Sequence, residues 1–136
     1  MTELRLLATR ESLDTVNAFI EEKLEACGCP PRAQMQLLVA IEEIYVNIAS
    51  YAYEPEQGDA VVGFDFDEGT RTITLVFRDW GIPFDPVLKE DPDVTLSAEE
   101  RGIGGLGIYM VKKSMDAFTY ERTGDGQNVV VIQKKI

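Results

Sequence analysis

The sequence contains no histidine, only two cysteines and few basic residues for its length. Without histidine the chain cannot form a Ser-His-Asp triad, a histidine-ligated metal site or a phosphohistidine. Its 13 Lys and Arg residues are outnumbered by 24 Asp and Glu residues, so the formal net charge is −11. This acidity argues against a nucleic-acid interface, which needs a basic surface, and against docking on anionic lipid.

Signals for export, membrane insertion and structural zinc binding are also missing. The first residues lack the basic and apolar segments of a signal peptide, and no apolar run approaches the roughly eighteen residues of a membrane span. Cys27 and Cys29 provide too few ligands for a structural zinc site, so we interpret them as reduced thiols at a helix end. We therefore expect a cytoplasmic protein that binds neither membrane nor nucleic acid.

The charge is unevenly distributed along the chain. Residues 1–100 carry a net charge of −14, whereas residues 101–136 carry a net charge of +3. An anionic ligand is therefore expected to contact the last third of the sequence.

The pattern of apolar residues predicts one α+β domain that spans residues 1–136. The expected order is a strand at 3–8, a helix from 13 to the turn at Gly28, a helix at 31–53, strands at 60–67 and 70–78, a helix at 106–115, and strands at 117–122 and 128–133. Between Trp80 and Gly105 the periodicity is lost, and a loop of this length is usually functional or mobile. The fold class is a two-layer sandwich, in which helices cover one face of a mixed, mainly antiparallel sheet.

Glu43 and Asn47 form the first pair of candidate functional residues. They are four residues apart on the second predicted helix, so they share one face, while Glu42 lies on the opposite flank. A carboxylate can accept a proton, and an amide oxygen suits a hard cation such as Mg²⁺. The alternative is a solvated glutamate beside an ordinary helix asparagine.

The second candidate site follows a predicted strand at the segment Arg78-Asp79-Trp80-Gly81. The strand places Asp79 at the edge of the core, where its carboxylate needs a donor such as the exocyclic amine of a base. Gly81 leaves room for a planar ring against the backbone. The alternative is a simple turn in which Asp79 caps nearby amides.

The third candidate site is the glycine-rich segment 102–107, which leads into the third predicted helix. Glycines allow backbone amides to converge on phosphate oxygens, and the helix N-terminus adds a favourable dipole. The segment fits the G-x-G-x-x-G pattern, but no hydrophobic strand precedes it, so a Rossmann fold is rejected. A P-loop motif is absent as well, and a flexible loop with a helix cap remains the alternative.

In this order and spacing, the motifs Glu43-x-x-x-Asn47, Asp79-x-Gly81 and Gly102-x-Gly104-Gly105-x-Gly107 resemble the N, G1 and G2 boxes of the GHKL ATPases. This superfamily includes histidine kinases, gyrase B and MutL. The match extends over essentially the whole chain, and within the superfamily the sequence looks like the stand-alone anti-sigma-factor serine/threonine kinases of bacteria.

The resemblance implies an ATP–Mg²⁺ site with defined roles. Glu43 would be the general base, Asn47 the Mg²⁺ ligand, Asp79 the partner of the adenine amino group and Gly81 the close-approach position. The segment from Asp85 to Arg101 would form a lid, and Arg101 is the best candidate in it to reach phosphate, although a lone loop arginine is more often merely solvated. The expected phosphate-binding segment comprises Gly102, Gly104, Gly105, Leu106 and Gly107.

The function implied by the resemblance is phosphoryl transfer from ATP to a serine of an anti-anti-sigma protein, combined with binding of a sigma factor. Members commonly form dimers, so a homodimer is expected. The alternative function is a nucleotide-dependent binding module that sequesters a partner without phosphorylating it. An isolated histidine-kinase catalytic domain fits less well, because the lid is short and the chain lacks a helical dimerisation segment.

Three departures from the family pattern concern the same site. Tyr51 stands where many members have a histidine, and Pro83 stands where many have a second glycine. Gln127 and Asn128 replace a Gly-Thr pair that often touches the nucleotide. Because Glu43, Asn47 and Asp79 are all present, we expect ATP binding to be retained.

Overall fold

The computed structural model describes residues 1–88 and 106–136. The predicted loop between Trp80 and Gly105 falls largely within residues 89–105, which are not described. Four candidate phosphate-binding residues therefore lie outside the described part of the chain: Arg101, Gly102, Gly104 and Gly105.

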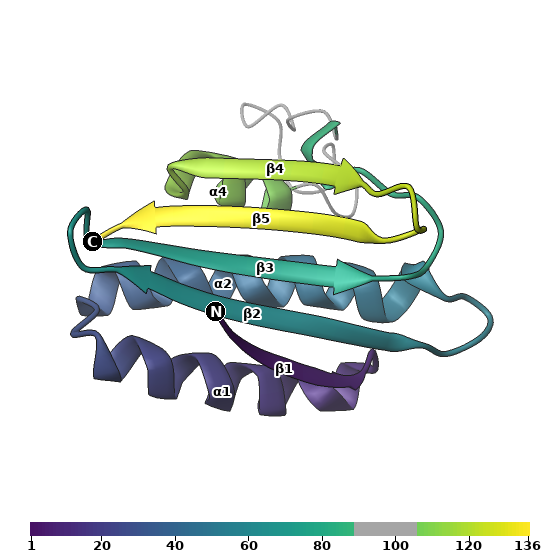
Figure 1. The fold of residues 1–136 in the computed structure, drawn as a ribbon, viewed down its shortest axis with the longest axis horizontal. Coiled ribbons are helices and arrows are strands. Elements are labelled where there is room, and N and C mark those ends of the chain that lie inside the picture. The colour runs from purple at the N-terminus through teal and green to yellow at the C-terminus, as the bar shows by residue number, and fades with distance from the viewer. Residues whose placement is uncertain (89–105) are drawn as a thin grey trace.

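Five strands form one sheet in the order β1-β2-β3-β5-β4 (Figure 1). They are β1 (Thr2–Leu7), β2 (Asp59–Asp67), β3 (Thr72–Asp79), β4 (Ala117–Arg122) and β5 (Asn128–Lys135). All four pairings between these strands are antiparallel, whereas the expected sheet was mixed. The reason is the position of β5, which lies between β3 and β4; these two strands point the same way but do not pair with each other (Figure 1).

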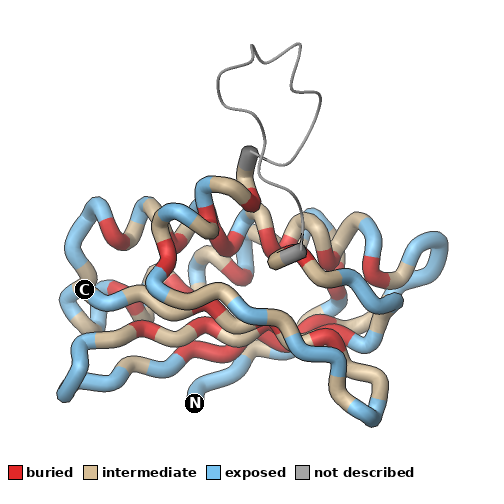
Figure 2. The backbone as a smooth tube through the Cα atoms, turned by 90° about the horizontal axis from the view of Figure 1, so that it is seen from above, coloured by how far each residue is buried: buried red, intermediate tan, exposed pale blue. Residues whose placement is uncertain are grey.

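The helices α1 (Leu13–Ala26), α2 (Pro31–Asn47) and α4 (Leu106–Ser114) lie on one face of the sheet (Figures 1 and 2). Their apolar stripes face the alternate residues of the strands, and the buried positions lie between these two layers (Figure 2). This confirms the two-layer α+β architecture. The buried residues include Val16, Ile20, Leu24, Leu37, Ile41, Ile44, Ile48, Ile73, Leu75, Phe77 and Ile132.

The ends of the first two helices follow the predicted glycine and proline signals. Gly28 has a φ of 72°, and the amides of Gly28 and Cys29 donate to the carbonyl oxygens of Glu25 and Leu24, which is the Schellman arrangement. Pro31 is the first residue of α2. Both cysteines are free thiols at this helix end, and burial raises the pKa of the Cys29 thiol. The predicted position of the cysteine pair at a helix end is therefore confirmed.

The second helix departs from regular α geometry before it ends. The predicted helix at 31–53 continues past Asn47 as a π-helical turn, η2 (Ile48–Ala52). Two short 3-10 turns complete the described elements, η1 (Arg10–Ser12) and η3 (Pro86–Leu88). Within residues 1–88 and 106–136, no helix is both long enough and apolar enough to cross a membrane.

Candidate functional site

Asp79 is the last residue of β3, and the sheet buries its carboxyl group. Its exposed fraction is 3%, and its Oδ1 accepts hydrogen bonds from the backbone amide of Gly81 and from the side-chain amide of Asn128, each at 2.9 Å. Burial raises the pKa of Asp79 above its usual value, while the bonds from Asn128 and Gly81 and the charge of Arg122 act in the lowering direction. The result is a desolvated acceptor at the end of a central strand.

Asn128 and Arg122 are functional candidates that the sequence motifs do not include. Asn128 begins β5 and faces Asp79 in the strand register, and Arg122 at the end of β4 faces Asn128 in turn. Arg122 donates to the carbonyl oxygen of Gly81 at 2.8 Å. Strand register thus brings together residues that are about 50 positions apart. In the sequence, the signal that could have identified Asn128 is a polar residue at the start of a strand that is otherwise apolar.

Gly81 lies where the end of β3 touches the π-helical turn. A Cβ atom at this position would be 2.1 Å from the carbonyl oxygen of Ala52, which accepts a hydrogen bond from the amide of Ile82 at 2.9 Å. The absence of a side chain is therefore required by backbone packing within the protein. The sequence predicts that a planar ring approaches this position; in this structure the group that approaches it is the backbone of Ala52.

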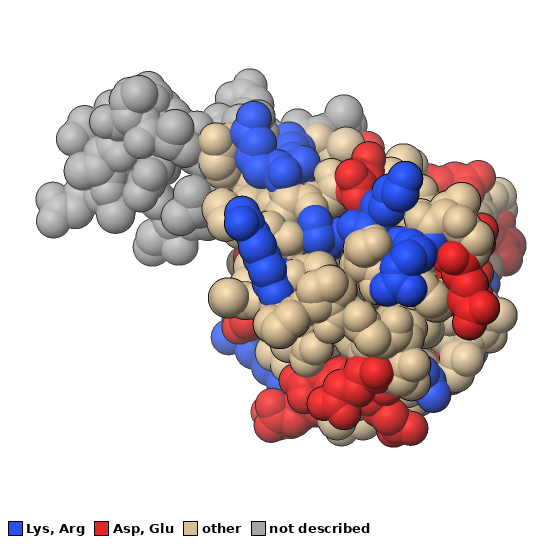
Figure 3. All heavy atoms as spheres, turned by 90° about the vertical axis from the view of Figure 1, so that its left-hand side faces the viewer, with Lys and Arg blue, Asp and Glu red and all other residues tan. Residues whose placement is uncertain are grey.

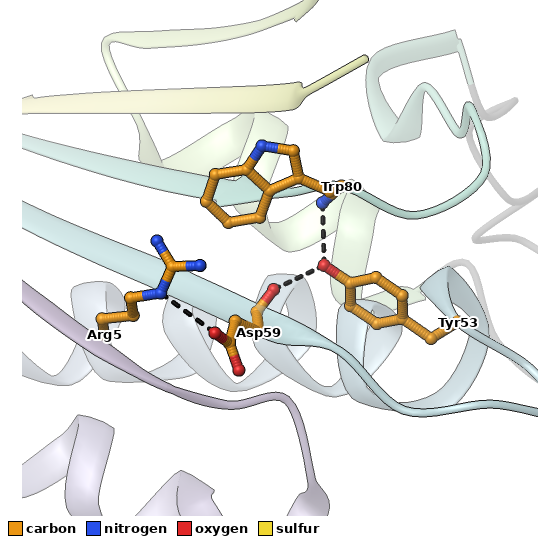
Figure 4. A network of polar contacts seen from close by, with 4 residues as sticks. All are labelled: Arg5, Tyr53, Asp59 and Trp80. Atoms are coloured by element: carbon orange, nitrogen blue, oxygen red, sulfur yellow. Dashed lines mark hydrogen bonds and ion pairs between the residues drawn. The ribbon is translucent and has the colours of Figure 1, made fainter. Parts of the chain in front are cut away.

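A polar network anchors the residue between Asp79 and Gly81 (Figure 4). The hydroxyl of Tyr53 donates to the carbonyl oxygen of Asp59 at 2.5 Å and accepts from the amide of Trp80 at 2.8 Å. Arg5 pairs with the Asp59 carboxylate at 3.0 Å and lies over the Trp80 ring at 4.8 Å. This network joins β1, β2 and the end of β3 at the corner that carries Asp79 (Figure 4).

Glu43 and Asn47 lie on α2, which packs against α4 beneath the sheet. Glu43 is half-buried, and a Cβ atom on Gly107 would be 2.1 Å from its Oε2, so the carboxylate lies against the first turn of α4. Asn47 lines a hollow beside Ile48, and its Nδ2 is buried without a hydrogen-bond partner among the described residues. The structure therefore places Glu43 at the start of the helix that follows the glycine-rich segment, and Asn47 one turn further along α2 at the hollow.

The hollow that Asn47 lines also reaches the Asp79 corner. Its walls are largely apolar and include Ile44, Ile48, Ala52, Ile82, Phe84 and Val130. Asn128 forms part of the same wall, and Tyr51, whose side chain is 58% exposed, lies at it as well. A largely apolar hollow with a few polar groups in its wall has the general character of a small-molecule site.

The donor set fits a magnesium ion only in combination with a bound phosphate. Within the described residues, no group of three or more Asp, Glu, Cys or His side chains could hold a metal ion. The Nδ2 of Asn47 has no hydrogen-bond partner within residues 1–88 and 106–136, and the oxygen and nitrogen ends of this amide can be exchanged by rotation. Since Mg²⁺ commonly takes one or two protein ligands plus substrate phosphates, a single amide oxygen at this position suits it.

The basic residues of the last third of the chain are concentrated away from this site. Asp79 lies at one end of the sheet, whereas Lys134 and Lys135 end β5 at the other end, near Lys112 and Lys113 at the end of α4 (Figure 1). Figure 3 looks at that other end and shows Lys and Arg side chains gathered over part of it. Except for Arg122, the described basic residues of the last third of the chain therefore lie away from the Asp79 end of the sheet.

Residues 6–134 match the family model described as the histidine kinase-like ATPase domain. The chain therefore belongs to the histidine kinase-like ATPase family, and the resemblance drawn from the three motifs is confirmed.

Two known proteins are similar to this chain. The serine/threonine-protein kinase BtrW of Bordetella bronchiseptica is 28% identical over 97 residues, which cover 71% of this chain and 67% of that protein. The crystal structure of the RsbU and RsbW domains of Rv1364c from Mycobacterium tuberculosis matches with a TM-score of 0.65 and 18% identity. That match covers 99% of this chain but 32% of the other, so the chain spans about a third of that protein. The structural likeness confirms the fold class.

Proposed function

We propose that the protein binds ATP with Mg²⁺ and transfers the γ-phosphoryl group to a serine of an anti-anti-sigma protein. One observation carries this proposal: Asn47 lines the same hollow as Asn128, which donates to the buried acceptor Asp79, and Glu43 lies on the same helix as Asn47 against the first turn of α4. Similarity to the kinase BtrW supports the choice of a protein kinase, and family membership supports ATP as the donor.

The proposed arrangement divides the nucleotide between three parts of the protein. The adenine amino group donates to Asp79, which is bonded to Asn128 in the wall of the hollow, and the ring lies between the apolar walls. The phosphates extend towards Gly107 at the start of α4, where backbone amides and the helix dipole favour negative charge. Arg101 and the glycines of the undescribed segment are proposed to complete the phosphate contacts.

Glu43 is the proposed general base. Its half-buried carboxylate lies at the first turn of α4, where the proposed γ-phosphate would be, so it is placed to accept the proton of an incoming serine hydroxyl. The serine oxygen forms a bond to phosphorus while the bond to the ADP oxygen breaks. Mg²⁺ held by Asn47 and the phosphates would neutralise the charge that develops during transfer.

The test is transfer of labelled γ-phosphate to purified candidate anti-anti-sigma domains. The Glu43→Gln variant should lose about 10²–10⁴-fold in rate, the usual contribution of a general base. Glu42→Gln is the matched control, because Glu42 is the adjacent carboxylate but is exposed on the other flank of α2. Its rate should remain that of the wild type.

The alternative function predicts a different outcome in the same assay. If no variant and no wild-type sample transfers phosphate, but ATP promotes a tight complex with the partner, the protein is a nucleotide-dependent binding module. A sigma factor as the second partner, homodimerisation and a cytoplasmic location are further parts of the proposal. Co-purification from the source cell with ATP or with ADP tests the partners, and sedimentation of the purified chain tests the dimer.

A further inference from the structure

Asn128 has every one of its side-chain hydrogen-bonding positions occupied. Its Nδ2 donates to Oδ1 of Asp79 at 2.9 Å and to the carbonyl oxygen of Ile82 at 2.7 Å. Its Oδ1 accepts from the hydroxyl of Tyr120 at 2.5 Å and from Nη1 of Arg122 at 3.1 Å. An asparagine side chain offers two donors and two acceptor positions, so this buried amide has no capacity left for a ligand.

These four partners determine which end of the amide faces Asp79. In the reversed orientation, the amide oxygen would face a carboxylate and a carbonyl oxygen, and the amide nitrogen would face the guanidinium group of Arg122. Each of these three contacts would then pair two acceptors or two donors, whereas the hydroxyl of Tyr120 can donate or accept in either orientation. Asn128 is therefore a fixed donor directed at Asp79.

The consequence for Asp79 is that its two carboxylate oxygens differ. Oδ1 receives two hydrogen bonds, from Gly81 and Asn128. Oδ2 receives none from residues 1–88 or 106–136. The carboxyl group therefore keeps a defined orientation and offers one acceptor to a ligand.

We propose that Asn128 is a positioning residue that gives this site its preference for adenine over guanine nucleotides, by holding Asp79 so that only Oδ2 is free. This inference rests on the proposed function. Adenine presents an amino donor to such an acceptor, whereas guanine presents a carbonyl oxygen at the equivalent ring position. A carboxylate facing that oxygen leaves both groups without a donor, which is costly in a desolvated site.

Loss of the Asn128 donor weakens this discrimination in two ways. The carboxyl group becomes free to rotate, and the pKa of Asp79 rises further because burial then acts with less opposition. A protonated carboxyl group can donate to the guanine oxygen. The groups that act on this titration are Arg122 from β4, whose charge lowers the pKa of Asp79, and Tyr53 after η2, which interacts with the Asp79 charge.

The test compares the dissociation constants of ATP and GTP for the wild type and the Asn128→Leu variant, by calorimetry at pH 6 and pH 8. Leucine has a similar size and no donor. We expect ATP to bind about 10- to 100-fold more weakly to the variant, the usual effect of removing a hydrogen bond to a charged group, with a much smaller change for GTP. The ratio of GTP to ATP dissociation constants should therefore fall, and it should fall more at pH 6 than at pH 8.

Gln133→Leu is the matched control, because it makes the same change on the same strand. The Gln133 amide donates to Thr74 of β3 at 3.1 Å, at the opposite end of the strand from Asn128. Both dissociation constants should stay at the wild-type values in this variant. If the Asn128→Leu variant does not fold, Asn128→Asp carries the test, since it keeps the shape and directs a carboxylate at Asp79.

A second measurement separates this inference from the proposed function. Carbon-13 NMR of the Asp79 carboxyl group in the nucleotide-free protein should show a higher pKa in the Asn128→Leu variant than in the wild type. An unchanged pKa, or an unchanged GTP-to-ATP ratio in a variant that binds ATP, overturns the inference alone. A folded wild-type protein that binds neither nucleotide overturns the proposed function, and the selectivity of Asn128 with it.

Discussion

Asp79 is an ionisable group that the fold buries, and its replacement by asparagine should change binding and stability in opposite directions. The two side chains have the same shape, so the hydrogen bonds from Gly81 and Asn128 to Oδ1 can be kept. What changes is the charge and the atom at the Oδ2 position, which becomes an amide donor. An adenine amino group would then face a donor.

The expected loss in ATP binding follows from that mismatch. A hydrogen bond to a charged group contributes about 1.5–3 kcal/mol, and its loss corresponds to a roughly 10- to 150-fold weaker affinity for ATP.

The free energy of unfolding of the nucleotide-free protein should change in the opposite direction, towards higher stability. Because burial raises the pKa of Asp79 above its unfolded value, stability falls as the pH rises through the folded pKa. At neutral pH the uncharged Asp79→Asn variant avoids this cost and should be more stable than the wild type.

Calorimetric titration with ATP and urea unfolding of the nucleotide-free protein measure the two effects. The stability gain should shrink as the pH is lowered from 8 to 5, since the wild-type carboxyl group then approaches its neutral form. Asp65→Asn serves as the control, because Asp65 is exposed on β2 and should change neither quantity. Unchanged ATP affinity in the Asp79→Asn variant would refute the adenine assignment, and a pH-independent loss of stability would refute the desolvation argument.

Three further substitutions test the geometry of the site. Gly81→Ala places a Cβ atom against the backbone of Ala52, which cannot move aside easily, so urea unfolding should show a loss of about 1–3 kcal/mol. Gly107→Ala meets the flexible end of Glu43 instead; stability should change by less than about 1 kcal/mol, while the phosphotransfer assay should show at least a roughly tenfold loss. Tyr53→Phe leaves two backbone groups without their partner and should cost about 1–3 kcal/mol, measured by unfolding with tryptophan fluorescence. Wild-type stability in the first and third variants, or full activity in the second, would contradict these expectations.

Local signals in the sequence predict most of the secondary structure. The apolar spacing of α1 and α2, the stop at Gly28 and the start at Pro31 act within a few residues of one another, so they can be recognised from a single sequence. The β4–β5 hairpin is local for the same reason. The position of β5 between β3 and β4 cannot be predicted from neighbouring residues. It depends on which strands pair with each other, and β3 is separated from β4 and β5 in the sequence by α4.

The residues of the candidate site also divide into those that a local motif predicts and those that only strand pairing brings together. Asp79, Glu43 and Asn47 are recognisable because each belongs to a motif with fixed spacing. Asn128 and Arg122 act through the register of three strands, and no short motif contains that information. The π-helical turn after Asn47 is a further case, since the residues of η2 continue the helical pattern and their sequence contains no stop signal.

The described lysines of the last third of the chain lie away from the proposed site, and the reason bears on how an acidic protein can bind a nucleotide. Lys112, Lys113, Lys134 and Lys135 lie at the end of the sheet opposite Asp79, so summed charge near the hollow is not what would attract phosphate (Figures 1 and 3). Short-range donors, namely backbone amides at the start of α4, act over a few ångströms and are insensitive to charges a Debye length away. A net charge of −11 therefore argues against a long polyanion, which meets the whole surface, but not against one nucleotide in a desolvated hollow.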